Sequence, residues 1–550
     1  MMTGTTAARR LVETLLLNGV DHVFCVPGES YLAVLDALHD AADRIRVVTC
    51  RHEAGAANMA EAYGKLTGKP GICMVTRGPG ATHAAVGVHT AQQDSTPLIL
   101  FVGQVAAADK GRGAFQEVDY RAAFGPLAKH ADELDEPGRT AEIVSRAFAT
   151  ALQGRRGPVV LALPEDKLHG DGGPPAPAAV TPARAGLDPA ALALVRERLR
   201  TAERPLVVLG GSGWTADALD ALRGWVERHD LPVVLSFRRK DLLNNTHPCF
   251  AGDLGLGANP QLVKRVGTAD LIVALGARLG ENPTQGYGLF TAADTSARLI
   301  HIHPGPEEIG RTWPPLIGAV ADVAPAALAL AGLELGRRWT NWRDAAYAEV
   351  QTFTRPIPVA DPVNLSEVVA HMSQALPPDA IVCNGAGNFA AWLHRFHRHR
   401  AWRTQLAPTS GAMGYGLPAA VAAKLVHPER EVVCFAGDGD FLMTGQELST
   451  AVQHGADLVV VVVDNGSYGT IRMHQEKHFP GRVTATELRN PDFAAWAEAC
   501  GAWSVRVERT EDFPPALAAA RAAGRPALVH LVTGLEQISP SATIAQLRGG

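Results

Sequence analysis

Short, almost wholly apolar runs recur along the chain and alternate with stretches of helical pattern. Three of them read PLILFVG (97–103), PLVVLGG (205–211) and DLVVVVVDN (457–465). A strand without polar alternation is buried on both faces, which is typical of a parallel sheet covered by helices on each side. The regular alternation of strand and helix favours βαβ units. The sequence therefore predicts an α/β protein.

Two segments interrupt this pattern in a chain of 550 residues, a length that suggests several domains. The first, HGDGGPPAPAAVTPARAG (169–186), is rich in Pro, Gly and Ala and has no apolar period. The second and weaker one is TFTRPIPVADPVN (352–364). We therefore predict three consecutive Rossmann-like or flavodoxin-like domains with parallel sheets, at residues 1–170, 187–340 and 360–550.

The charge and cysteine pattern narrows the class of protein further. The net charge of −5 offers no basic field for nucleic acid or for an anionic membrane. No run of eighteen apolar residues occurs, and the first residues are too polar for a signal peptide. Seven scattered cysteines without a CxxC pair indicate reduced thiols. We expect a cytoplasmic protein with no nucleic-acid or membrane partner, and we expect the basic run HRFHRHR (394–400) to be a solvated helix end.

The stretch AGDGDF (436–441) places Asp438 and Asp440 around Gly439, directly after an apolar strand. Ligands of open α/β sheets bind beyond the carboxyl ends of strands, and a glycine turn followed by a helix, here expected near residue 443, suits a phosphate. A carboxylate beside a phosphate needs a cation between them, and Mg²⁺ prefers oxygen ligands. Asn465 ends the next strand, at the same sheet edge. The alternative is an acidic turn that only caps a helix, and Asn465 favours the metal.

A second stretch, TCRHEAGAANMAEAYGKLTG (49–68), brings Glu53 to the start of a helix whose first turns are lined with small residues. Taken alone, Glu53 is better interpreted as an acid at a helix N-terminus. We expect the neighbouring His52 to be structural.

The GDG turn followed by Asn465 resembles the fingerprint of thiamine diphosphate (ThDP) enzymes. Further segments resemble the acetolactate synthase branch of that family, in the family's order and over nearly the whole chain. They are TRGPGATH (76–83), GRGAFQEVD (111–119), GPVVLALPED (157–166) and SGAMGYGLPAAVAAKL (410–425). The resemblance implies a first domain that binds the pyrimidine of ThDP, a central domain, and a third domain that binds the diphosphate.

The resemblance also assigns roles to residues of the third domain. It implies that Mg²⁺ is held by the side chains of Asp438 and Asn465 and by the carbonyl of Ser467. Met413 would prop the cofactor in its bent form, and the Gly411 carbonyl would accept a hydrogen bond from the 4′-amino group. Asp440 is expected to point away from the phosphates as a helix N-terminal acid. The full set implied for the cofactor is Glu53, Gly387, Asn388, Gly411, Met413, Asp438, Gly439, Asp440, Asn465 and Ser467.

Catalytic residues follow from the same resemblance. Glu53 would hydrogen-bond the pyrimidine and drive its amino group to the imino form, and Gln116 would lie beside the reacting carbon. Glu29 follows VPG, where acetolactate synthases usually carry Gly and simple decarboxylases Asp. His474 replaces a Trp that shapes the pocket for the second substrate. Arg77 stands in place of a Ser and Phe389 in place of a His, and the adjacent His pair of simple pyruvate decarboxylases is absent.

The expected function is ThDP- and Mg²⁺-dependent decarboxylation of a 2-oxo acid, followed by carboligation to a carbonyl acceptor or by release of an aldehyde. Such an enzyme is a transferase or a lyase. Two alternatives stay open: a lyase that cleaves a 2-hydroxyacyl compound, and a non-catalytic relative that binds or regulates. The presence of Glu53, Asp438 and Asn465 argues against the second.

The resemblance further implies a homodimer or homotetramer whose active sites are shared between chains. The central domain contains GGSGWTA (210–216) after a strand, a weak nucleotide fingerprint. Relatives carry FAD, ADP or no nucleotide there, and the sequence leaves that choice open.

Overall fold

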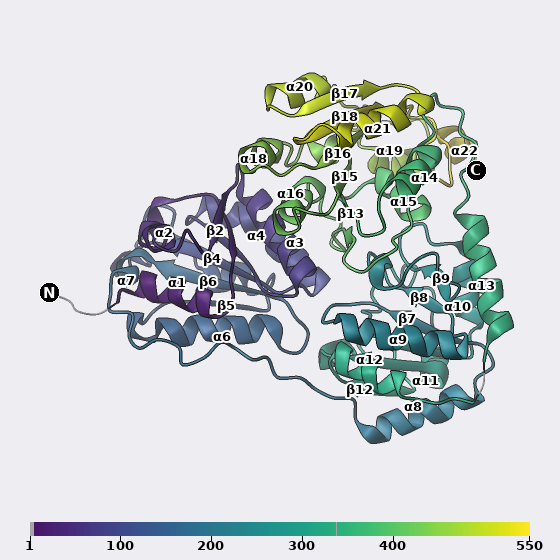
Figure 1. The fold of residues 1–550 in the computed structure, drawn as a ribbon, viewed down its shortest axis with the longest axis horizontal. Coiled ribbons are helices and arrows are strands. Elements are labelled where there is room, and N and C mark those ends of the chain that lie inside the picture. Colours follow the sequence, from purple (N-terminus) through teal and green to yellow (C-terminus); the bar gives the residue numbers. More distant parts are fainter. Residues whose placement is uncertain (1–4, 337, 550) are drawn as a thin grey trace.

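Three all-parallel sheets of six strands organise the chain (Figure 1). The structure is a computed structural model and describes residues 5–336 and 338–549. The strand orders are β2-β1-β3-β4-β6-β5, β12-β11-β10-β7-β8-β9 and β14-β13-β15-β16-β18-β17. The predicted fold class, three consecutive α/β domains with parallel sheets, is confirmed.

The first sheet buries its central strands completely, as the apolar runs predict. Its strands are β1 (His22–Cys25), β2 (Arg46–Thr49), β3 (Gly71–Val75), β4 (Leu98–Gln104), β5 (His130–Glu133) and β6 (Pro158–Pro164). The helices are α1 (Ala7–Leu17), α2 (Leu32–His39), α3 (Glu53–Thr67), α4 (Pro79–Asp94), α5 (Tyr120–Phe124), α6 (Thr140–Leu152) and α7 (Glu165–Leu168).

The central sheet, drawn in teal in Figure 1, lies beside the other two. Its strands are β7 (Pro205–Leu209), β8 (Val233–Leu235), β9 (Phe250–Asp253), β10 (Leu271–Leu275), β11 (Leu299–His303) and β12 (Ile317–Val320). The helices are α8 (Pro189–Thr201), α9 (Ala216–His229), α10 (Pro260–Thr268), α11 (Ala292–Arg298), α12 (Val323–Ala331) and α13 (Thr340–Phe353). The Pro-rich segment 169–186 carries no helix and leads from α7 to α8, and α13 leads along one side of the molecule toward the third sheet.

The third sheet has the buried strands β15 and β16, of six residues each, at its centre. Its strands are β13 (Ile381–Asn384), β14 (Gln405–Leu406), β15 (Val432–Gly437), β16 (Val459–Asp464), β17 (Trp503–Val507) and β18 (Ala527–Val532). The helices are α14 (Leu365–Ala375), α15 (Asn388–Phe396), α16 (Gly416–Val426), α17 (Asp438–Phe441), α18 (Glu447–His454), α19 (Gly469–His478), α20 (Phe493–Ala499), α21 (Phe513–Arg521) and α22 (Ile544–Gly549). Across the described residues, none of the helices has the length and apolar character needed to cross a bilayer.

The basic run 394–400 is not a solvated helix end, and that expectation is wrong. His397 and His399 are almost fully buried. The backbone N–H of His399 donates to Asn245 Oδ1 at 2.9 Å, and Lys240 Nζ donates to the His397 carbonyl at 3.0 Å. A loop of the central domain packs over the run. The local pattern of charges in the sequence does not predict a contact with residues so far away in the chain.

A buried ionic cluster holds the first domain against the third. Helix α3 packs along α16, and Tyr415, just before α16, donates its hydroxyl to Glu61 Oε2 at 2.5 Å. Lys65 Nζ lies 3.3 Å from Glu61 Oε1 and 2.9 Å from Asp94 Oδ2. Both carboxylates are fully buried, and burial raises the pKa of Glu61. Each charge depends on its partners, because an unpaired buried charge is costly.

Replacing Lys65 by Met tests this cluster. The variant leaves the buried Glu61 carboxylate without its cation and Asp94 with only the longer 4.0 Å contact to Arg239, a loss typically worth about 3–5 kcal/mol. We expect a clearly lower midpoint of thermal unfolding than in wild type. The control is Lys69→Met just beyond the end of α3, because Lys69 Nζ makes a half-exposed ion pair of 3.9 Å with Asp21 and a hydrogen bond of 3.2 Å to the Gly19 carbonyl. Equal midpoints for the two variants would contradict this account.

Candidate active site

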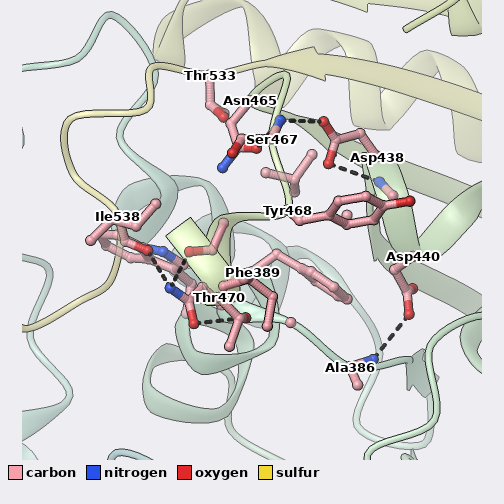
Figure 2. Close-up of a pocket in the computed structure, with 18 of the residues that line it drawn as sticks. Ala386, Phe389, Asp438, Asp440, Asn465, Ser467, Tyr468, Thr470, Thr533 and Ile538 are labelled. Atoms are coloured by element: carbon pink, nitrogen blue, oxygen red, sulfur yellow. Dashed lines mark hydrogen bonds between the residues drawn. The ribbon is translucent and has the colours of Figure 1, made fainter. Parts of the chain in front are cut away.

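A cavity of about 230 Å³ opens at the carboxyl ends of β15 and β16 (Figure 2). All the described residues that line it belong to the segment 365–538. They include every candidate cofactor residue of the third domain, namely Gly387, Asn388, Gly411, Met413, Asp438, Gly439, Asp440, Asn465 and Ser467. The structure therefore brings four sequence-distant loops to one place, the position at which open α/β sheets bind ligands.

Asp438 follows β15 directly and is buried. Its Oδ1 accepts the backbone N–H of Gly439 at 2.9 Å, and its Oδ2 accepts that of Ser467 at 3.2 Å. Asn465 Oδ1 also accepts from the Ser467 N–H, at 3.1 Å. Burial raises the pKa of Asp438 to about 6, because it disfavours the charged carboxylate. A cation bound nearby would favour the charged form. The neighbouring carboxylate, amide and carbonyl oxygens are the ligand type that Mg²⁺ prefers.

Asn490 holds the Asp438 carboxylate in place, and no sequence motif points to this residue. Its Nδ2 donates to Asp438 Oδ2 at 2.8 Å and to Asp464 Oδ1 at 2.7 Å. The single helix expected near residue 443 is also replaced by two. The short α17 begins at Asp438 itself, and α18 begins at Glu447.

The N-terminus of α15 supplies the other wall of the cavity. Asn388 uses its side chain within the protein, because Nδ2 donates to the Ile538 carbonyl and Oδ1 accepts from Thr470 Oγ1, both at 3.0 Å. An anion at the N-terminus of α15 would instead accept hydrogen bonds from backbone N–H groups of the first helical turn. The ring of Phe389 packs where a Cβ on Gly437 would lie, 2.6 Å away, so Phe389 is a buried wall residue.

Asp440 points away from Asp438 and toward Ala386 (Figure 2). Its Oδ1 accepts the backbone N–H of Ala386 at 3.0 Å and that of Gly414 at 2.9 Å. The carboxyl is buried, and burial raises its pKa to about 7. Asp440 therefore ties together the loops that carry Gly387, Met413 and Asp438.

In the first domain, the loop 76–80 gathers the candidates Glu29, Glu53 and Gln116. Arg77 Nη2 donates to Glu29 Oε1 at 3.2 Å, and its Nη1 donates to Glu165 Oε2 at 2.8 Å. A Cβ on Gly78 would lie 2.8 Å from the Cβ of Gln116, whose own φ of 65° is unusual for a side-chain-bearing residue. Such backbone strain is frequent at functional sites.

The start of α3, which carries Glu53, is fixed by the third domain of the same chain. The buried carboxylate of Glu447 in α18 accepts the backbone N–H of Arg51 at 3.2 Å and of His52 at 2.9 Å. A Cβ on Gly55 would lie 2.4 Å from Glu447 Oε1, so this approach requires glycine. His52 itself caps the helix through its Nδ1, which accepts the Ala54 N–H at 3.1 Å.

Within one chain, the candidates of the first domain lie outside the described lining of the third-domain cavity. Glu29, Glu53 and Gln116 are absent from the described residues that line the third-domain cavity, and His474 is exposed on α19. Large apolar side chains are exposed close to both groups. They are Leu32 and Phe115 in the first domain, and Leu442, Met443, Ile471 and Phe479 in the third. Exposed apolar side chains gathered around functional loops are typical of a surface that another chain covers.

Comparisons with known proteins agree with this geometry. Three family models of thiamine pyrophosphate enzymes match this chain. The N-terminal TPP binding domain matches residues 5–123, the central domain matches 192–330, and the C-terminal TPP binding domain matches 385–531. The chain therefore belongs to the thiamine pyrophosphate (ThDP) enzyme family.

Relatives place the chain on one branch of this family. It is 32% identical to the acetolactate synthase large subunit of Parasynechococcus marenigrum, over 99% of this chain and 91% of that protein. It is also 32% identical to the acetolactate synthase large subunit of Corynebacterium glutamicum, over 96% of this chain and 87% of that protein. The predicted class, a ThDP-dependent enzyme of the acetolactate synthase-like branch, is confirmed.

Replacing Asp440 by Ala tests its function as a link between loops. The change removes an acceptor shared by two backbone N–H groups, and hydrogen bonds to charged groups contribute about 1.5–3 kcal/mol each. We expect the affinity for ThDP, measured by calorimetry, to fall about tenfold or more. Asp188→Ala serves as control, because Asp188 caps α8 of the central domain and is not among the described residues that line the cavity. An unchanged affinity in Asp440→Ala would refute the link.

Proposed function

We propose that this protein decarboxylates a 2-oxo acid with ThDP and Mg²⁺, and then either joins the retained acyl unit to a carbonyl acceptor or releases it as an aldehyde. The observation that carries the proposal is the convergence of Asp438, Asn465 and Ser467 on the cavity that α15 also faces, in a chain of this family. The thiazolium ring of the bound cofactor supplies the electron sink for decarboxylation.

The residues of the third domain fit this cofactor. The side chains of Asp438 and Asn465 and the carbonyl of Ser467 hold Mg²⁺, which neutralises the diphosphate. Backbone N–H groups at Gly387 and Asn388 bind the phosphate oxygens, since a helix N-terminus favours anions. The carbonyl of Gly411 and the side chain of Met413 orient the pyrimidine half.

The residues of the first domain fit proton transfer and substrate binding. Glu53 exchanges a proton with the pyrimidine, and Gln116 lies beside the reacting carbon. Glu29 holds or moves a proton at the substrate. Arg77 fixes the orientation of the Glu29 carboxylate, because its Nη2 lies 3.2 Å from Glu29 Oε1. His474 borders the site of the carbonyl acceptor. The donor 2-oxo acid and the acceptor are both small molecules.

We further propose that each active site is shared by two chains of a homodimer or homotetramer. The lack of first-domain residues among the described lining of the cavity supports this arrangement, as do the exposed apolar side chains beside both groups. Ligand sites often form at such interfaces. The free cysteines, of which six are buried, fit the reducing cytoplasm that we propose as the compartment.

A nucleotide in the central domain, FAD or ADP, stays outside the proposed reaction, because decarboxylation and carboligation need no net redox step. The glycine loop after β7 is packed within the protein: a Cβ on Gly211 would lie 2.1 Å from the Gly276 carbonyl, and Ser212 Oγ donates to the Ser95 carbonyl at 2.6 Å. A neighbouring cavity of about 350 Å³ is lined by Arg239 and Arg278, which would suit a phosphate-bearing ligand. The visible absorbance of the purified protein tests for a flavin.

The release of CO₂ from a panel of 2-oxo acids, with ThDP and Mg²⁺ present, tests the function. We expect Glu53→Gln to bind ThDP but to lose about 10²–10⁴ in rate, the usual contribution of a general acid or base. The control is Glu142→Gln at the exposed start of α6. No CO₂ from any 2-oxo acid, or near-normal rates in Glu53→Gln, would contradict the proposal.

Mixing two inactive variants tests the shared site. Glu53→Ala and Asp438→Ala should each be nearly inactive alone. In a mixed dimer one site keeps both residues and the other has neither. With random pairing about half of the dimers are mixed, so co-expression should restore about a quarter of wild-type activity. If each site came from one chain, every site would carry a lesion and activity would stay at the level of the single variants.

A further inference from the structure

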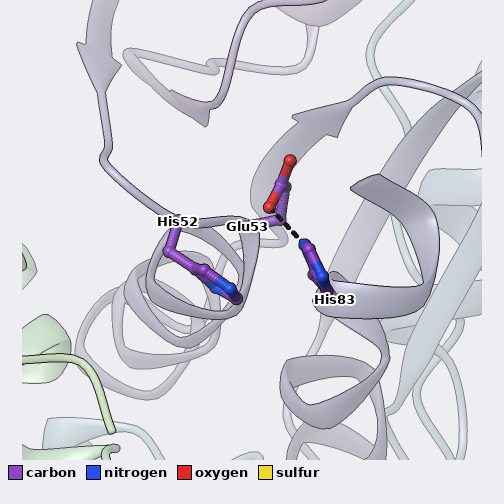
Figure 3. Close-up of side chains that lie close together, drawn as sticks. All are labelled: His52, Glu53 and His83. Atoms are coloured by element: carbon purple, nitrogen blue, oxygen red, sulfur yellow. Dashed lines mark hydrogen bonds and ion pairs between the residues drawn. The ribbon is translucent and has the colours of Figure 1, made fainter. Parts of the chain in front are cut away.

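His83, in the first turns of α4, lies against the carboxylate of Glu53 (Figure 3). Its Nδ1 is 2.9 Å from Glu53 Oε2. The ring of His52 stacks on that of His83 with centroids 4.6 Å apart. The motif TRGPGATH gave no reason to single out His83, because the contact joins the starts of two helices thirty residues apart in the chain.

These three side chains could in principle hold a metal ion, since their ligand atoms lie within 4.8 Å of one another. The tautomer of His52 argues against it. His52 Nδ1 accepts the Ala54 N–H at 3.1 Å, so the proton of the neutral ring is on Nε2. Binding a metal through Nε2 would move that proton to Nδ1 and break the cap of α3. The cluster is therefore better suited to proton chemistry.

Burial shifts the pKa of the other titratable groups beside this pair toward the neutral form. Burial, and to a lesser extent His83, lowers the pKa of His52. Cys73 on β3 and Tyr31 at the start of α2 interact with Glu53, and burial raises the pKa of both groups. His83 is the side chain that hydrogen-bonds the Glu53 carboxylate.

We propose that His83 is a positioning residue for Glu53 in cofactor activation. This inference rests on the proposed function and deepens it. Neutral His83 donates its Nδ1 proton to Glu53 Oε2 and so orients the carboxylate. The other oxygen, Oε1, faces Gly80, where a Cβ would lie only 3.3 Å away. The missing side chain at Gly80 keeps this oxygen open to the pyrimidine.

The direction of the effect follows from the geometry. Glu53 promotes activation through a hydrogen bond to the pyrimidine. A carboxylate that is free to rotate presents Oε1 to the pyrimidine for only part of the time, so loss of the Nδ1 contact lowers the rate of activation.

Two substitutions test the orientation of Glu53. His83→Ala removes the hydrogen-bond donor, whereas His83→Asn keeps one. Two quantities are measured at pH 8: the affinity of the apo-protein for ThDP with Mg²⁺, by calorimetry, and the exchange of the ThDP C2 proton with deuterium, by NMR. His39→Asn is the control, because His39 is exposed at the end of α2.

At pH 8 we expect His83→Ala to lose about tenfold in exchange rate and His83→Asn to restore most of it. His39→Asn should exchange the proton and bind ThDP as wild type does. Normal exchange in His83→Ala, or no rescue by His83→Asn, overturns the inference. Glu53→Gln in the same assay separates the two hypotheses. If it exchanges normally, the proposed function fails; if it alone loses exchange, only the function of His83 is refuted.

Discussion

The packing of α3 on the third domain is the contact on which the rest of the site depends. One end of α3 begins at Glu53 and is held by the Glu447 carboxylate, and its middle is tied to Tyr415 through Glu61. Because α3 can neither rotate nor slide without breaking these buried bonds, the face of the first domain that carries Glu53, the proposed catalytic acid, has a fixed orientation. A shift of about 1 Å in a catalytic group is enough to cost two orders of magnitude in rate.

Buried charge makes this contact specific as well as strong. Buried ion pairs in general can often be replaced by well-packed apolar side chains with little loss of stability. Apolar surfaces, however, pack in several registers, whereas a buried carboxylate must meet its donors. We therefore see the cluster as the feature that selects one arrangement of the domains.

The sequence predicted those parts of the molecule that are set by local pattern. The apolar strand runs gave the three parallel sheets, and the turn around Asp438 with Asn465 indicated one sheet edge, where both line a single cavity. Contacts between segments far apart in the chain could not be predicted from the sequence. The bridge from Asn490 to Asp438 and the cover over His399 depend on side chains that meet only after folding.

The two acids of the AGDGDF turn show how one short segment serves two needs. Both carboxyls are buried, and burial raises the pKa of each. They avoid one another because they point in opposite directions, Asp438 toward Ser467 and Asp440 toward Ala386 and Gly414. The first faces the proposed metal, and the second fixes the loops around it. Because one glycine separates them, a movement of Asp438 would also move the loops that Asp440 holds around the cavity.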